Sequence, residues 1–154
     1  MSHIAIVDSG GANIASLLFA FERLGVAAEL TTDPDIISSA DRVVLPGVGA
    51  ARDAMQRLID ARLVDVVRGL RRPVLGICLG MQLLCQSSEE ADEAKGLGIL
   101  PHTIKRFGQD VKVPQLGWNE VRPVVAGPYE TGEAYFANSF RLLDAPGDWG
   151  FAET

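Results

Sequence analysis

A cysteine stands between two glycines at the point where a short apolar run changes into a helical pattern. The run Val74–Ile77 leads directly into Cys78, within the segment Gly76–Gln82, which reads GICLGMQ. A strand–turn–helix junction of this kind forces its central residue into a strained backbone conformation and lifts the side chain into the open. The residues two positions away must then be small, and Gly76 and Gly80 meet that need. We therefore predict that Cys78 is a nucleophile.

The start of the following helix supports this chemistry. A helix N-terminus carries about half a positive charge and unpaired N–H groups, which favours the thiolate, the reactive form of cysteine. The backbone N–H of Leu79, directly after the nucleophile, is placed to stabilise an oxyanion. The alternative for any free cysteine is a buried structural role. We assign that role to Cys85, which follows Leu83 and Leu84 in the same predicted helix.

A second glycine-rich turn ends the preceding apolar strand. Pro46-Gly47-Val48-Gly49 follows the run Arg42–Leu45. Because the carboxyl ends of parallel strands meet at one edge of a sheet, this turn should lie beside Cys78. Glycines let the backbone approach a ligand closely. A backbone N–H from Gly47, Val48 or Gly49 is therefore the predicted second donor to the oxyanion, although a plain turn is the simpler alternative.

Composition limits the class of protein. The chain has 154 residues with 47% apolar and 22% charged residues and a net charge of −6, which is typical of one globular domain. There is no Lys/Arg-rich run, so nucleic acids and anionic membranes are unfavourable partners. The N-terminus lacks the features of a secretory signal, so we expect a cytoplasmic protein.

The cysteines and histidines indicate neither a disulfide nor a metal site. On one helix, Cys78 and Cys85 would be about 10 Å apart, beyond the roughly 7 Å between Cα atoms that a disulfide permits. His3 and His102 do not stand at a ligand-like spacing from either cysteine. We therefore expect free thiols and no metal.

Strand and helix patterns alternate in the first half of the chain. Apolar runs predict strands, and spacings of three, four and seven predict amphipathic helices. The expected strands are His3–Asp8, Ala28–Thr32, Arg42–Leu45 and Val74–Ile77. The expected helices are Asn13–Leu24, 33–40, Ala50–Leu70 and 79–87. This alternation indicates a parallel sheet with helices on both faces.

The second half has a different pattern. Thr103–Phe107, Trp118–Val125 and Glu133–Phe140 are expected as antiparallel strands between glycine and proline turns. The predicted fold class is thus α/β, a flavodoxin-like parallel sheet with flanking helices plus a C-terminal antiparallel section. We expect residues 1–154 to form one domain.

Four segments together give the chain a family resemblance. They are IVDSGGANIASL around Asp8–Leu17, LPGVGA at Leu45–Ala50, GICLGMQLL at Gly76–Leu84 and VPQLGWNEV at Val113–Val121. This chain resembles the class I glutamine amidotransferases, and among them the glutaminase subunits of imidazole glycerol phosphate synthase. The first and last segments are the more discriminating. The likeness covers essentially the whole chain.

The resemblance implies a reaction, a substrate and a partner. Cys78 would attack the side-chain amide of glutamine and release ammonia, and water would clear the thioester to give glutamate. Gln82 and Gly49 would help to bind glutamine, and no cofactor would be needed. Ammonia would pass to a cyclase subunit, a (β/α)8 barrel, in a heterodimer that serves histidine biosynthesis. Asn13 and the Gly10-Gly11 turn would face that partner, although an ordinary helix cap after a turn explains them equally well.

The sequence also departs from the family pattern. The family completes its triad with a His-Pro-Glu segment beyond the second set of strands, and neither His3 nor His102 matches it. We therefore expect that the C-terminal part of the family fold is missing, that the chain is truncated, and that residues 1–154 alone have little glutaminase activity. The family usually has histidine at the position of Asn138 and an aromatic residue at that of Ser9.

Two other hypotheses remain open. The fold could serve as a non-catalytic module that docks a partner. It could also be a redox sensor of flavodoxin-like fold, in which a cysteine on the same elbow is oxidised rather than acylated.

Overall fold

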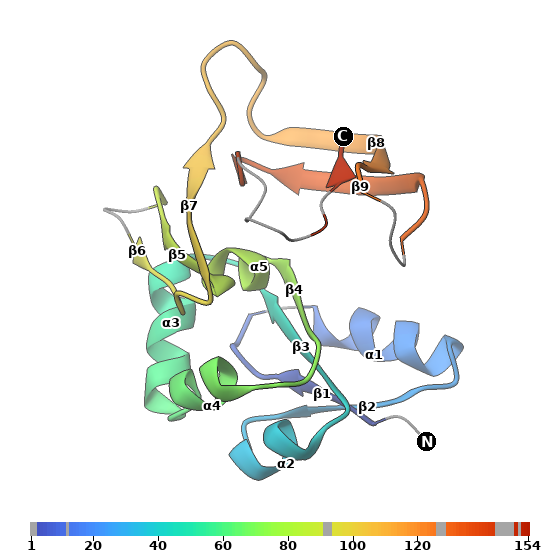
Figure 1. The fold of residues 1–154 in the computed structure, drawn as a ribbon, viewed down its shortest axis with the longest axis vertical. Helices are drawn as coiled ribbons and strands as arrows, with labels where there is room; N and C mark the ends of the chain where they lie inside the picture. The colour runs from blue at the N-terminus through green and yellow to red at the C-terminus, as the bar shows by residue number, and fades with distance from the viewer. Residues whose placement is uncertain (1–2, 12, 91–93, 126–128, 144–149, 151) are drawn as a thin grey trace.

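The protein has a parallel sheet with helices on both faces and two smaller sheets beyond one edge of it (Figure 1). The structure, a computed structural model, describes residues 3–11, 13–90, 94–125, 129–143, 150 and 152–154. The central sheet has four strands in the order β2-β1-β3-β4. They are β1 (His3–Val7), β2 (Ala27–Thr31), β3 (Arg42–Gly47) and β4 (Val74–Cys78). This confirms the predicted α/β class with its parallel sheet.

Two clusters of apolar side chains hold helices against the two faces of this sheet. On one face Ile6 and Val44 pack against Ile14, Leu18 and Phe21 of α1 (Ile14–Arg23). The opposite face packs against four other helices, which are α2 (Pro34–Ser39), α3 (Ala51–Asp60), α4 (Val64–Gly69) and α5 (Leu79–Leu84). In the inner strands β1 and β3 the apolar side chains are buried on both faces, which is why these two strands are nearly continuous apolar runs. Leu30 in β2 and Leu75 and Ile77 in β4, by contrast, are exposed.

Local capping residues set the helix starts that the sequence predicts. The side chain of Asn13 accepts a hydrogen bond from the backbone N–H of Ser16 at the start of α1. Asp33 does the same for the N–H groups of Asp35 and Ile36 at the start of α2 (Pro34–Ser39). Pro34 stands at the first helical position, where its missing N–H costs nothing. These helices match the predicted ones to within one residue at each end.

The single long helix predicted for Ala50–Leu70 is wrong, because α3 ends at Asp60 and α4 begins at Val64. Arg62 takes a left-handed conformation with φ 59°. The N–H of Leu63 donates to the carbonyl of Leu58, and the N–H of Arg62 donates to that of Ile59. This is a Schellman motif, usually built with glycine at the left-handed position. Leu58 and Leu63 are both buried, so the helical spacing of apolar residues continues across the break. The sequence pattern therefore does not indicate that the helix ends there.

The helix predicted to reach Ser87 is also too long. α5 ends at Leu84 and the chain continues as β5 (Cys85–Ser88), so Cys85 lies in a strand and not in a helix. The carbonyls of Leu83, Leu84 and Cys85 accept hydrogen bonds from the N–H groups of residues 97, 99 and 98. This distant segment takes the place of the next helical turn.

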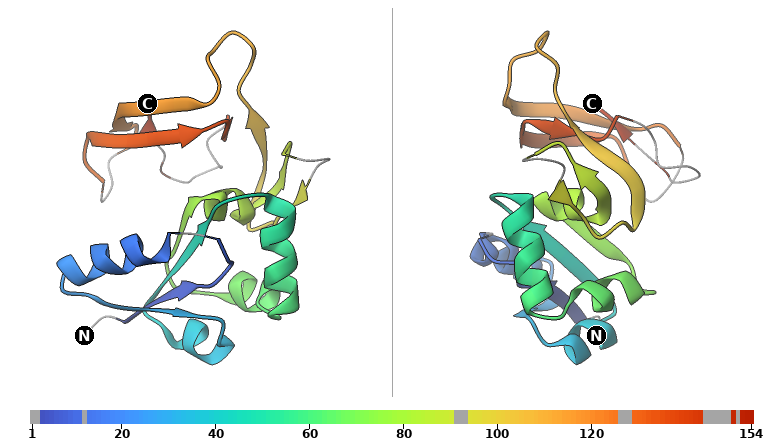
Figure 2. Two further views of the ribbon diagram at one scale, coloured as in Figure 1. Left: turned by 180° about the vertical axis from the view of Figure 1, so that it is seen from behind. Right: turned by 90° about the vertical axis from the view of Figure 1, so that its left-hand side faces the viewer.

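The remaining strands form two small sheets. β5 pairs in parallel with β7 (Leu100–Arg106). The sequence pattern predicts only antiparallel strands in this half of the chain, so it misses this parallel pair. The first small sheet has the order β10-β7-β5-β6, with β6 at Ala94–Lys95 and β10 at Phe140–Arg141. The second has the order β11-β8-β9, with β8 at Gln115–Pro123, β9 at Gly132–Asn138 and β11 at Ala152–Glu153. Figure 2 shows the β8–β9 hairpin on the far side of α5 from the parallel sheet.

No helix among the described residues is both long enough and apolar enough to cross a membrane.

Candidate active site

Cys78 occupies the turn between β4 and α5. It is the last residue of the strand and the N-cap of the helix, with φ 55° and ψ −119°. A non-glycine residue with positive φ is uncommon and is held in place only by its surroundings. The Cys78 thiol is exposed, whereas Cys85 is fully buried, and both cysteines are free. The structure therefore presents one thiol to solvent, on the elbow that the sequence indicates.

The two glycines beside this elbow are required by close packing. A Cβ atom at Gly80 would lie 1.7 Å from the carbonyl oxygen of Leu45, and one at Gly76 would lie 2.6 Å from Cα of Met81. Both distances are below any real contact. The helix α5 can thus pack onto β3 and β4 only because these positions carry no side chain, which is the physical reason for the G-x-C-x-G spacing.

The Pro46–Gly49 turn lies directly beside Cys78. In the register of the parallel sheet Gly47 is opposite Cys78, at the usual strand spacing of about 4.8 Å. A Cβ at Gly47 would lie 2.9 Å from the backbone nitrogen of Gly80, so this turn touches the first turn of α5. Gly49 has φ 87° and Val48 is half exposed. The structure brings these residues together with Leu79, as the sequence places them.

The turn after β1 contacts the same loop. The hydroxyl of Ser9, which is buried, donates a 2.6 Å hydrogen bond to the carbonyl of Pro46. Arg57 donates from Nη1 to the Ser9 carbonyl at 3.3 Å. A Cβ at Gly11 would meet the Val48 side chain at 3.4 Å. The Gly10-Gly11 turn and the helix cap Asn13 are therefore at the edge of the sheet that carries Cys78.

Gln82 belongs to a hydrogen-bonded group that the sequence alone did not reveal. The hydroxyl of Ser88, in β5, donates to Oε1 of Gln82 at 3.4 Å and accepts the backbone N–H of Glu90 at 3.2 Å. Oε2 of Glu90 is buried without a hydrogen-bond partner among the described residues. A buried carboxylate oxygen without a partner is costly, so it calls for a water, a cation or a ligand group. The signal in the sequence, Ser88-Glu89-Glu90 after GICLGMQ, is too common a combination to be noticed.

Neither histidine lies near Cys78 along the sheet. Ile4 pairs with Arg42, and Cys78 pairs with Gly47, five residues further along β3. His3 precedes Ile4 by one residue, so it is about 20 Å from the elbow at 3.3 Å per residue. Its Nε2 contacts Glu29 at 2.9 Å. His102 lies in β7, in the first small sheet. Asn138 ends β9, where its Nδ2 donates to the carbonyl of Phe140 and its Oδ1 is buried without a described partner.

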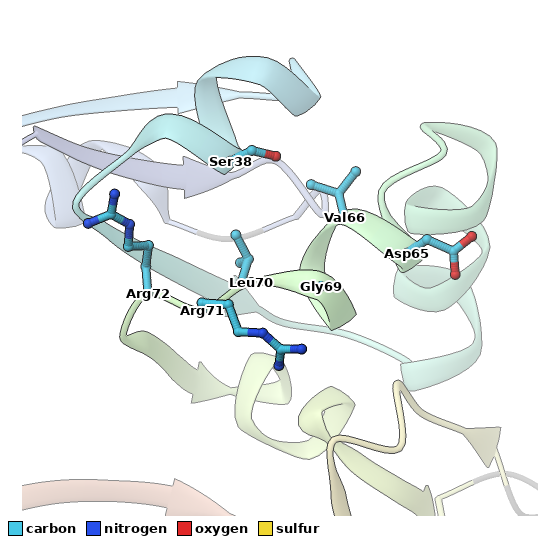
Figure 3. Close-up of a pocket in the computed structure, with 7 residues that line it drawn as sticks. All are labelled: Ser38, Asp65, Val66, Gly69, Leu70, Arg71 and Arg72. Atoms are coloured by element: carbon cyan, nitrogen blue, oxygen red, sulfur yellow. The ribbon is translucent and has the colours of Figure 1, made fainter.

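A shallow pocket of about 330 Å³ lies at the opposite end of β4 from Cys78. It is lined by Ser38, Asp65, Val66, Gly69, Leu70, Arg71 and Arg72. The two arginine side chains point away from each other, and the carboxylate of Asp65 points away from both (Figure 3). Because its polar groups do not converge, this pocket does not form a catalytic constellation.

The sequence matches known proteins over nearly all of its length. The family model described as "Glutamine amidotransferase class-I" matches residues 5–127. The imidazole glycerol phosphate synthase subunit HisH of Xanthomonas euvesicatoria pv. vesicatoria (strain 85-10) is 44% identical over 147 residues, which is 91% of this chain and 73% of that protein. The subunit HisH of Xylella fastidiosa (strain Temecula1 / ATCC 700964) is 42% identical over 149 residues, covering 92% of this chain and 74% of the relative.

Solved structures show the same fold at low sequence identity. A crystal structure of a glutamine amidotransferase superimposes with a TM-score of 0.78 at 17% identity, covering 98% of this chain and 79% of that one. The glutaminase domain of the Trypanosoma brucei CTPS with bound acivicin gives a TM-score of 0.60 at 16% identity, with 92% and 68% covered. The elbow, the glycine turn and these matches have one explanation: the chain belongs to the class-I glutamine amidotransferase family, among the imidazole glycerol phosphate synthase subunits HisH.

Proposed function

We propose that this chain is a glutaminase subunit that hydrolyses glutamine to glutamate and ammonia through a thioester on Cys78. The observation that carries the proposal is the exposed thiol on a strained strand–helix turn, one strand away from Gly47. An exposed nucleophile beside backbone N–H groups is the arrangement that acyl transfer requires.

The reaction begins when the Cys78 sulfur bonds to the carbon of the side-chain amide. The π electron pair of the C=O bond moves to oxygen, which becomes an oxyanion. When the C=O bond re-forms, the C–N bond breaks, and the nitrogen leaves as ammonia after gaining a proton. One water molecule then cleaves the thioester, which gives glutamate and restores the thiol. The net reaction consumes one glutamine and one water.

Backbone N–H groups hold the oxyanion in this proposal. Leu79 supplies one donor, from the first turn of α5. The loop of Gly47, Val48 and Gly49 supplies the other, because it lies across from Cys78 in the neighbouring strand. Removing one such donor from an enzyme costs about 10² to 10³ in kcat. The glycines keep this backbone open to the substrate.

The substrate glutamine binds beside α5. Gln82 and Gly49 hold it, and Glu90 joins them as a residue that the structure adds to the prediction. The buried Oε2 of Glu90 has no described partner, so it is available to a cationic group such as an α-amino group. Gln82 lies four residues after Cys78, in the first turns of α5, and in this proposal its amide reaches the substrate beside the thiol.

The proton for departing ammonia requires a general acid. General acid–base help contributes about 10² to 10⁴ in rate, and histidine most often supplies it. His3 lies at the other end of β1, and His102 lies in the first small sheet. We propose on this ground that a polypeptide of residues 1–154 by itself hydrolyses glutamine slowly.

The proposed partner is the cyclase subunit of imidazole glycerol phosphate synthase, which receives the ammonia in a cytoplasmic heterodimer of histidine biosynthesis. The relatives carry the name of one subunit of that synthase. Gly10, Gly11 and Asn13 are the proposed contact, because Gly11 and Asn13 are exposed at the edge of the sheet that carries Cys78. In this proposal residues 1–154 act as one domain and need no cofactor.

Alkylation by the glutamine-like electrophile 6-diazo-5-oxo-L-norleucine tests the nucleophile. We expect a single adduct on Cys78, found by peptide mass mapping. Cys85 is the internal control, because burial raises the pKa of its thiol and keeps it protonated. Glutamine should slow the labelling, and norleucine should not. Labelling of Cys85 alone, or equal labelling of both cysteines, would overturn the proposal.

The same experiment separates the two competing hypotheses. A non-catalytic docking module predicts no preference of Cys78 for the glutamine-like reagent over a simple alkylating agent. A redox sensor predicts fast oxidation of Cys78 by peroxide together with no protection by glutamine. Protection by glutamine argues against both.

A further inference from the structure

Ser88 is one of the two buried polar residues among the described part of the chain, with 2% of its surface exposed. It lies at the end of β5, after the helix that follows Cys78. Its hydroxyl makes two hydrogen bonds, and both lead to residues of the proposed glutamine site. The hydroxyl hydrogen goes to Oε1 of Gln82 at 3.4 Å, and its oxygen accepts the N–H of Glu90 at 3.2 Å.

The direction of the first hydrogen bond fixes the Gln82 amide. An amide side chain has an acceptor end and a donor end of nearly equal shape, so an unconstrained glutamine populates both orientations. The Ser88 oxygen accepts the backbone N–H of Glu90, and the single hydroxyl hydrogen is donated to Oε1 of Gln82. The Nε2 group of Gln82 is then left to donate to an acceptor outside this pair.

The second hydrogen bond acts on Glu90. It links the backbone of Glu90 to the same hydroxyl that orients Gln82, so one small side chain sets two groups. Glu90 Oε2 is buried without a described partner. A donor from Gln82 and an acceptor from Glu90 together match a ligand that carries both a carbonyl or carboxylate oxygen and an ammonium group, as an amino acid does.

We propose that Ser88 is a positioning residue for glutamine binding, which orients the Gln82 amide and anchors Glu90 without touching the substrate. This inference rests on the proposed function. It assigns to β5 a role in substrate affinity, and it predicts that Ser88 acts on binding rather than on the chemistry of the Cys78 thiol.

Ser87 provides a matched control in the same strand. Its hydroxyl is also hydrogen-bonded, at 2.9 Å to the hydroxyl of Thr103 in β7. Because successive side chains of a strand point to opposite faces, Ser87 is directed away from Gln82. The variants Ser87→Ala and Ser88→Ala therefore remove the same atom from neighbouring residues, but only the second disturbs the Gln82 amide.

The experiment measures how glutamine protects Cys78 of the full chain against iodoacetamide, with the cyclase subunit present in a parallel series. We expect Ser88→Ala to raise the half-protecting glutamine concentration by about fivefold, within the range of one lost hydrogen bond. Ser87→Ala should leave it unchanged, and Ser88→Thr, which keeps the hydroxyl, should restore it. The labelling rate without glutamine should be the same in all variants, since Ser88 does not act on the thiol.

A double-mutant cycle with Gln82→Ala distinguishes positioning from a general loss of structure. If Ser88 acts through Gln82, then adding Ser88→Ala to Gln82→Ala raises the half-protecting concentration by much less than fivefold. Equal effects of Ser88→Ala in both backgrounds would mean that Ser88 acts through Glu90 alone, and would overturn its assignment to the Gln82 amide. Equal effects of Ser87→Ala and Ser88→Ala would overturn the inference as a whole. Failure of glutamine to protect the unmodified chain would instead refute the proposed function itself. Thermal unfolding of each variant checks that it is folded.

Discussion

At the scale of single residues, the spacing of small side chains around Cys78 is sufficient to predict the elbow. The sequence places Gly76 and Gly80 two residues on either side, and the structure shows why no other residue fits. The family resemblance implies that Gln82 binds glutamine, but the hydrogen-bond partners of its amide do not follow from the sequence. Ser88 reaches Gln82, and the N–H of Glu90 reaches Ser88, only because the chain turns from helix to strand after Leu84, and that turn depends on distant backbone contacts.

Substitution of Gly80 tests the elbow directly. Gly80→Ala would place Cβ 1.7 Å from the Leu45 carbonyl oxygen, so α5 would have to move away from β3. We expect a loss of about 3 kcal/mol or more in the free energy of unfolding, at or above the usual range for overpacking. Urea denaturation measures it.

Gly69→Ala is the control for this change. Gly69 lies in α4, and nothing is within 4 Å of an added Cβ. The same substitution should there be neutral or stabilise by up to about 1 kcal/mol. Equal effects at the two positions would contradict the packing argument.

At the scale of helices and strands, local sequence signals predict where a helix starts better than where it ends. Asp33-Pro34 and Asn13 are side-chain caps, and each marks a helix start correctly. The end of α3 has no such mark, because arginine stands where glycine is expected and the apolar period continues through Leu63. The parallel pairing of β5 with β7 is likewise invisible, since it joins residues about fifteen apart through backbone groups that every sequence has.

Arg62→Gly tests the Schellman ending of α3. A non-glycine residue in the left-handed region costs roughly 1 to 2 kcal/mol, which glycine would avoid. Glycine also has more conformational freedom in the unfolded chain, and the loss of this freedom on folding offsets part of the gain. We expect a net gain of about 0.5 kcal/mol in the free energy of unfolding, measured by chemical denaturation. Arg52→Gly, the same change within α3, should instead lose about 0.5 to 1 kcal/mol. A loss at both positions would contradict the assignment.

At the scale of the whole molecule, the alternation of apolar strands and amphipathic helices predicts the central layers. α1 covers one face and α3 and α4 cover the other, as the patterns require. The small sheets are less predictable. The β8–β9 hairpin has Trp118 and Tyr135 exposed on one face, with their rings in edge contact, so the apolar pattern of these strands does not report a buried core.

Two surface carboxylates make the stability of the molecule depend on pH. A hydrogen bond from Lys105, helped by the N–H of Arg106, holds the pKa of Glu89 below its ordinary value of 4.5. The N–H of His3 holds the pKa of Asp41 below 3.8. A carboxylate whose pKa is lower in the folded protein than in the unfolded chain stabilises the folded state at pH values above its unfolded-state pKa. This stabilisation is lost as the pH falls through the folded-state pKa.

We therefore expect the free energy of unfolding to decrease as the pH falls below about 4.5. Denaturation midpoints measured between about pH 6 and pH 3 should show this slope, and Glu89→Gln should reduce it. Because both carboxylates are exposed, the change should also shrink at high salt. A midpoint that rises over this range would show that the sign is wrong.

The most direct test of the account is a crystal structure of the chain after reaction with 6-diazo-5-oxo-L-norleucine. We expect a carbon–sulfur bond to Cys78, with the ketone oxygen about 2.7 to 3.1 Å from the backbone nitrogen of Leu79 and from a backbone nitrogen of the Gly47–Gly49 loop. An adduct on Cys85, or a ketone oxygen that points into solvent away from both donors, would contradict it.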